Sequence, residues 1–126
     1  DLSHPTLRHQ PGSVRFAGSW SVRLTGSGFH TNHVHPQGWI SSAFYAAVPD
    51  AAEAGDAPAG HIAFGVPPHE LGLDLPPIRT IKPKPGTLIL FPSTMWHGTL
   101  PIIGGERLTV AFDVKAPPLA VATRRC

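Results

Sequence analysis

The chain has 126 residues, which is enough for one domain and too few for two ordinary ones. Its 13 Gly and 15 Pro exclude long helices, because both residue types interrupt them. The net charge of +2 comes from scattered cations, which argues against a nucleic-acid-binding surface, and the single cysteine excludes an internal disulfide framework. No stretch approaches 18 apolar residues and no signal peptide is evident at the start, so we expect a cytoplasmic protein that does not span a membrane.

Short apolar or alternating runs separated by Gly and Pro follow one another along the whole chain. Such runs are typical of β-strands joined by turns. In chain order, we predict strands at 13–25 (a strand pair with a bend at Ala17–Gly18), 29–35, 39–48, 61–66, 78–83 (an edge strand), 87–91, 95–99 and 107–114.

About eight short strands with regularly spaced turns predict an all-β sandwich, jelly roll or barrel. We find no internal repeat and expect a single domain over residues 1–126. The chain begins at Asp1 rather than Met, so we also expect it to be a piece of a longer protein.

Histidine is unusually frequent, with eight in the chain, and three of them lie close together in the segment His30–His35. On a strand, His33 and His35 point to the same side, at positions about 6–7 Å apart along the backbone. His30 is an odd number of residues from both and is expected to point the other way. Two alternating histidines can equally be ordinary surface or core residues.

A third histidine, His97, follows a hydrophobic strand and lies between Trp96 and Gly98, so we expect it to be buried. A buried imidazole needs a polar partner, which can be a backbone group or a metal ion. Together with the pair at 33 and 35, it predicts a three-histidine site for a first-row divalent metal, with coordination positions left open for catalysis.

Ten residues further on, Arg107 and Thr109 share one face of the last predicted strand. A guanidinium with a neighbouring hydroxyl can bind a carboxylate through several hydrogen bonds. Tyr45, in the most continuous apolar run, can present its phenol to the same anion. Each of these residues also has an ordinary interpretation, Arg107 as a surface residue and Tyr45 as core.

These residues resemble the iron(II)- and 2-oxoglutarate-dependent dioxygenases, whose pattern is HxD/E…H followed by an arginine. The resemblance covers roughly residues 15–115 and is closest to a 2OG-Fe(II) oxygenase branch that occurs alone or at the end of longer proteins. The segments that carry it are SWSVRL (19–24), HVHPQGWISSAFY (33–45), LILFPSTMWHGT (88–99) and RLT (107–109).

The resemblance implies a double-stranded β-helix, which is a jelly-roll or cupin-like barrel, with Fe(II) as cofactor and 2-oxoglutarate as co-substrate. It matches His33 and His97 to the iron ligands and Arg107, with Thr109, to the carboxylate site of 2-oxoglutarate. Tyr45 aligns with a tyrosine that contacts the same carboxylate. The chain departs from the pattern at His35, which stands where the family has an acid, and either binds the metal itself or points at substrate or water.

The resemblance thus predicts an enzyme that hydroxylates a small-molecule or peptidyl substrate and releases succinate and CO2. A metal-dependent cupin with three histidines, acting as an oxygenase or isomerase without 2-oxoglutarate, is the alternative. Gly86, Pro92 and His97 keep the spacing of the second cupin motif, but no Glu follows His35 before Glu53. The other alternative is a non-catalytic β-sandwich that binds a partner. We expect no nucleic-acid or membrane partner, and the sequence makes no prediction of oligomeric state.

Overall fold

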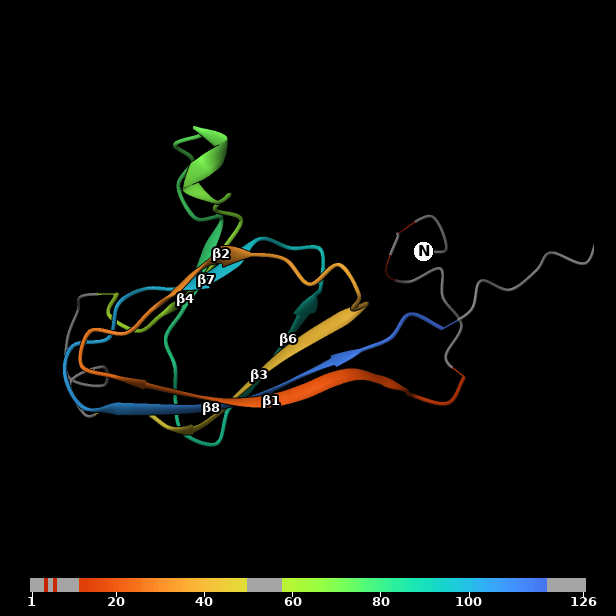
Figure 1. Ribbon diagram of the computed structural model, residues 1–126, viewed down its shortest axis with the longest axis horizontal. Helices are drawn as coiled ribbons and strands as arrows, with labels where there is room; N and C mark the ends of the chain where they lie inside the picture. Colours follow the sequence, from red (N-terminus) through yellow and green to blue (C-terminus); the bar gives the residue numbers. More distant parts are fainter. Residues whose placement is uncertain (1–3, 5, 7–11, 50–57, 118–126) are drawn as a thin grey trace, which may run out of the picture.

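The protein is built from two four-stranded antiparallel sheets that lie face to face (Figure 1). The computed structural model describes residues 4, 6, 12–49 and 58–117. The strands are β1 (Phe16–Thr25), β2 (His30–His33), β3 (Ile40–Ala47), β4 (Ile62–Phe64), β5 (Arg79–Ile81), β6 (Leu88–Pro92), β7 (His97–Thr99) and β8 (Glu106–Val114). Within this described part, the only helical segment is the 3-10 turn η1 (His69–Leu71), and no helix has the length and apolarity needed to cross a membrane.

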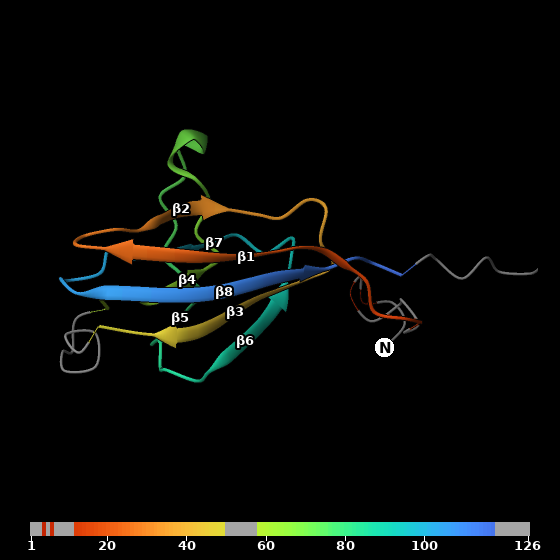
Figure 2. The same ribbon diagram turned by 60° about the horizontal axis from the view of Figure 1, so that its bottom comes forward.

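The strand pairing is nested, because β1 pairs with β8, β2 with β7, β3 with β6 and β4 with β5. One sheet has the order β1-β8-β3-β6 and the other the order β2-β7-β4-β5, so consecutive strands alternate between the two sheets except for β4 and β5, which lie side by side in one sheet (Figure 2). This arrangement is a jelly roll. The predicted all-β class is therefore confirmed, and among the sandwich, jelly roll and barrel the jelly roll is the one observed.

The strands lie where the sequence predicts them, although β4, β5 and β7 are shorter than the predicted 61–66, 78–83 and 95–99. Two further differences concern β1 and β2. The bend at Ala17–Gly18 is a shift of register within β1, between Phe16 and Gly18, so residues 13–25 contain one strand rather than a pair. The strand predicted over 29–35 ends at His33, because its pairing with β7 is irregular and stops there. β5 is an edge strand as predicted.

The hydrophobic core lies between the two sheets, where β3 and β6 of one sheet face β4 of the other. The sheet of β3 and β6 contributes Ala43, Tyr45, Ile89 and Phe91, and the other sheet contributes Ile62 and Phe64. The rings of Phe64 and Phe91 meet edge to face, with their centroids 5.1 Å apart. Beside this core a cavity of about 380 Å³ lies between the two sheets, and five of the predicted site residues line it: His33, His35, His97, Arg107 and Thr109.

Candidate metal and co-substrate site

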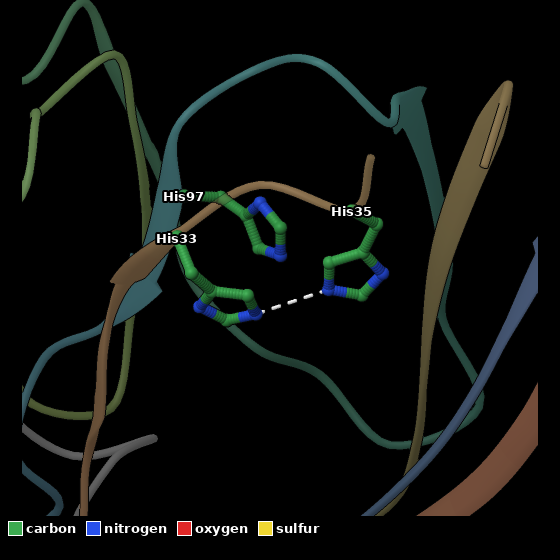
Figure 3. A group of neighbouring side chains, drawn as sticks. All are labelled: His33, His35 and His97. Carbon is green, nitrogen blue, oxygen red and sulfur yellow. Dashed lines mark hydrogen bonds between the residues drawn. The ribbon is translucent and has the colours of Figure 1, made fainter. Parts of the chain in front are cut away.

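Three histidines from two neighbouring segments meet in the cavity (Figure 3). His33 ends β2 and His97 begins β7, and these two residues face each other in the strand pairing. His35 lies in the loop after β2, where its backbone N–H donates to the Ser93 carbonyl at 2.9 Å. One ring nitrogen from each histidine lies within 4.8 Å of the others. The structure thus brings the three predicted residues together, although His35 reaches the site from a loop and not from a strand.

Each of the three rings is oriented by an acceptor at Nδ1. The acceptor is the Thr31 carbonyl for His33 at 2.7 Å, the Met95 carbonyl for His97 at 3.0 Å, and the Asp113 carboxylate for His35 at 2.6 Å. An imidazole that donates from Nδ1 keeps a lone pair on Nε2. These contacts therefore select the tautomer that binds a metal through Nε2.

The nitrogens are also spaced as metal ligands would be. The Nε2 atoms of His33 and His35 are 3.0 Å apart. Two nitrogens at about 2.1 Å from one ion and at a right angle to each other are themselves about 3.0 Å apart. With both Nδ1 atoms donating, the facing lone pairs repel unless a proton or a cation lies between them. The donor set therefore fits a divalent metal of the first row, for which imidazole is a preferred ligand.

Burial keeps the third histidine neutral. His97 is 7% exposed and its ring packs against Phe91, with centroids 4.6 Å apart. The loss of hydration lowers the pKa of His97 to about 4. The ring is therefore uncharged at neutral pH and available as a ligand.

A buried guanidinium lines the same cavity. Arg107 is 2% exposed, yet it forms no ion pair with any carboxylate of the described residues. Its guanidinium donates from Nε to Thr109 Oγ1 at 3.1 Å, from Nη1 to the Gly60 carbonyl at 3.1 Å and from Nη2 to Thr99 Oγ1 at 3.3 Å. Burial lowers its pKa, but an arginine remains charged. A buried cation with neutral partners is suited to receive a carboxylate from a ligand.

Tyr45 lies against Arg107 and not on the wall of the cavity. Its side chain is fully buried, and the guanidinium carbon of Arg107 lies 4.9 Å from the ring centroid, a cation–π contact. Tyr45 Oη has no hydrogen-bond partner among the described residues, and burial raises the pKa of the phenol, which keeps it protonated. An unpartnered phenol beside a buried arginine fits the predicted contact with an incoming carboxylate.

Two further residues of the site were not predicted from the sequence. His30 lines the cavity, because the irregular pairing between His30 and His33 changes the side to which it points, so the expected opposite orientation is wrong. Burial lowers the pKa of His30, and the nearby charges of Arg107 and His33 lower it further. Asp113 contacts His35. The sequence could have pointed to it, because Asp113 is an even number of residues from Arg107 and Thr109 and therefore lies on the same face of the strand.

Comparison with known proteins agrees with this geometry. A family model described as "Putative 2OG-Fe(II) oxygenase" matches residues 18–113. The chain belongs to this 2OG-Fe(II) oxygenase family. Among curated proteins, no sequence matches the chain.

Solved structures of 2OG-Fe(II) oxygenases share the fold. An oxidoreductase of the 2OG-Fe(II) oxygenase family from Burkholderia pseudomallei is 18% identical and superposes with a TM-score of 0.62, covering 90% of this chain and 47% of its own. A prolyl-4-hydroxylase from Pseudomonas putida is also 18% identical, with a TM-score of 0.57, and covers 79% of this chain and 51% of its own. The chain thus spans about half the length of these two proteins. The likeness confirms the jelly-roll fold that the resemblance implied.

Proposed function

We propose that this 2OG-Fe(II) oxygenase is a dioxygenase that hydroxylates its substrate with Fe(II) and 2-oxoglutarate. The observation that carries the proposal is that two unlike sites line one cavity: a set of three imidazoles with free Nε2 lone pairs, and the buried cation of Arg107. 2-Oxoglutarate would use both sites, because one end of it can chelate the metal while the carboxylate at the other end pairs with the arginine. A structural metal site does not require such an arginine.

Each residue has a separate task in this proposal. His33, His35 and His97 hold the iron. Arg107 and Thr109 bind the distal carboxylate, and the ring of Tyr45 packs against the guanidinium of Arg107. When bound, the metal and co-substrate supply the oxidation: O2 oxidises 2-oxoglutarate to succinate and CO2, and one oxygen atom enters a substrate C–H bond. The protein contributes positioning and an apolar wall, to which Phe91 and Ile62 belong, that limits the access of water.

The substrate is proposed only as a class, a small molecule or a peptide. The aromatic rings of Trp20 and Phe29 line the cavity while remaining 39% and 56% exposed, so they stand at the boundary between cavity and solvent. Such a boundary suits a substrate that enters with an apolar or amide-containing part. Nucleic acid and membrane are not among the proposed partners, and the cytoplasm remains the compartment predicted from the sequence.

The first test measures succinate formed from 2-oxoglutarate by the purified protein with Fe(II), ascorbate and O2. Succinate that depends on added iron and disappears in His33→Ala supports the dioxygenase. A protein that binds iron tightly but forms no succinate, with or without candidate substrates, would instead be the three-histidine cupin. A protein that binds no metal at all would be a non-catalytic binding domain.

The second test compares Arg107→Ala with Arg23→Ala. Arg23 is an exposed arginine on the adjacent strand β1, paired with Glu106 at 2.5 Å. We expect Arg107→Ala to raise the dissociation constant for 2-oxoglutarate roughly 10–100-fold, because charge-assisted hydrogen bonds contribute about 1.5–3 kcal/mol. The Arg23 variant should bind it as the wild type does. Equal affinity of the two variants, measured calorimetrically without O2, would remove Arg107 from the co-substrate site.

A further inference from the structure

The three histidines differ in the group that orients them. His33 and His97 each face a neutral backbone carbonyl, whereas His35 faces the carboxylate of Asp113. The Nδ1–Oδ2 distance of 2.6 Å is short, as expected for a charge-assisted hydrogen bond. His35 also occupies the position where the general HxD/E pattern of iron(II)- and 2-oxoglutarate-dependent dioxygenases has an acid. Among the described residues, the one carboxylate that contacts any of the three histidines therefore lies behind the histidine that departs from this pattern.

Asp113 is held firmly in this position. Its second oxygen, Oδ1, accepts a hydrogen bond from Ser41 Oγ at 2.7 Å, and Ser41 Oγ lies 2.8 Å from Ser93 Oγ. Ser41 and Ser93 are completely buried and Asp113 is 6% exposed. Each carboxylate oxygen of Asp113 thus has one hydrogen-bond partner in a largely buried region. A buried carboxylate that is held at both oxygens has a defined orientation, and it orients the ring that it contacts.

The turn that carries His35 is packed closely over this network. Gly38 ends the turn, and its N–H donates to the His35 carbonyl at 3.0 Å. A Cβ added at Gly38 would overlap Ser93 Oγ and come within 2.9 Å of Ser93 Cβ and 3.3 Å of Asp113 Cγ. The turn, the serines and the carboxylate therefore form one packed unit around His35.

We propose that Asp113 is a positioning residue that makes His35 the equivalent of the acidic iron ligand. The inference rests on the metal centre of the proposed function. Three neutral imidazoles leave a divalent ion with its full charge, whereas an acidic ligand removes one unit of it. Asp113 places that negative charge one imidazole away from the metal, and it holds His35 with Nδ1 protonated and Nε2 directed at the ion.

The experiment measures Co(II) affinity and spectra in the full chain, with Asp113→Asn as the main variant. Asparagine has the same shape but no charge. We expect a 10–100-fold weaker affinity for Co(II), which is typical when a group that hydrogen-bonds a metal ligand is removed. We also expect the visible absorption of the bound Co(II) to shift. Thermal unfolding of the metal-free variant should show a single cooperative transition. Ser41→Ala, which removes the donor to Oδ1, should weaken Co(II) binding by a smaller factor.

The matched control is Ser42→Ala, on the same strand as Ser41. Ser42 is 4% exposed, and its Oγ exchanges hydrogen bonds of 2.9 Å with the backbone of Phe112 instead of with Asp113. It tests whether the loss of a buried serine contact between β3 and β8 is enough to weaken the metal site. We expect lower stability in this variant with unchanged Co(II) affinity.

A thermodynamic cycle then tests whether Asp113 acts through His35. In the His35→Ala background, Asp113→Asn should cause no further loss of Co(II) affinity. Wild-type affinity in Asp113→Asn, or an equal loss in both backgrounds, would overturn the inference. Neither result affects the proposed function, which fails only if the wild-type protein binds no iron or forms no succinate.

Discussion

Arg107 shows how much a single buried residue determines in this site. Its charge is removed from water and held by two hydroxyls and a carbonyl, all of them neutral. Such a charge is costly to bury, and each donor that loses its partner adds to the cost. The threonines around it are therefore expected to matter for stability as well as for binding.

Replacing Thr109 tests this expectation in the protein without ligands. Thr109→Val keeps the shape of the side chain but leaves Arg107 Nε without its acceptor. We expect the free energy of unfolding in urea to fall by about 1–3 kcal/mol. Thr80→Val, at an exposed position of the edge strand β5, should change it by less than about 0.5 kcal/mol. Equal changes in the two variants would mean that the Nε contact contributes nothing specific.

Tyr45 can act through its ring, which contacts Arg107, and through its hydroxyl, and a single substitution distinguishes the two. Because Tyr45 Oη is buried without a partner among the described residues, Tyr45→Phe should not lower the stability of the ligand-free protein. If the phenol receives the co-substrate carboxylate, the same variant should bind 2-oxoglutarate roughly 2–10-fold more weakly. Unchanged affinity would limit Tyr45 to the cation–π contact with Arg107.

At the scale of elements, strand β8 carries both the buried arginine and the carboxylate that contacts His35. Its buried face presents Arg107, Thr109, Ala111 and Asp113 at alternate positions. Alternation follows from the two-residue period of a strand, so the anion site and the support of His35 lie along one face. Strand β2 behaves differently, because its irregular pairing with β7 brings His30 and His33 into the same cavity.

The pairing of β2 with β7 depends on Gly98. A Cβ at this position would lie 2.9 Å from the His30 carbonyl oxygen and would overlap Asn32 Oδ1. Gly98→Ala must therefore move β2 away from β7, which separates His33 from His97. We expect a loss of stability of about 1–3 kcal/mol and weaker metal binding. Gly12→Ala has nothing within 4 Å of the added carbon and serves as the control, for which both measurements should match the wild type.

At the scale of the whole molecule, the three-histidine cluster lies between the two sheets. His33 and His97 belong to the sheet of β2 and β7, while His35 is bonded to Asp113 of β8 in the other sheet. A metal bound by all three histidines therefore links the sheets at the cavity. An ion that binds only the folded protein stabilises it in proportion to the logarithm of its concentration.

The stabilisation can be measured with Mn(II), which avoids oxidation. At a free concentration about 100 times its dissociation constant, Mn(II) should raise the free energy of unfolding by about 2.7 kcal/mol, and a chelator should reverse the change. His97→Ala should abolish the effect. Stabilisation that persists in this variant would place the ion elsewhere in the protein.

The sequence by itself determined the all-β class, most strand positions and the candidate groups His33, His35, His97 and Arg107. It could do so because strand periodicity and the chemistry of imidazole and guanidinium are local properties. The tertiary structure decided which groups meet. His30 enters the cavity through an irregular strand pairing, and Asp113 reaches His35 although 78 positions separate them in the chain. Both results depend on how the sheets pair and pack. Strand alternation places Asp113 on the same face of β8 as Arg107, but it does not show that this face meets His35.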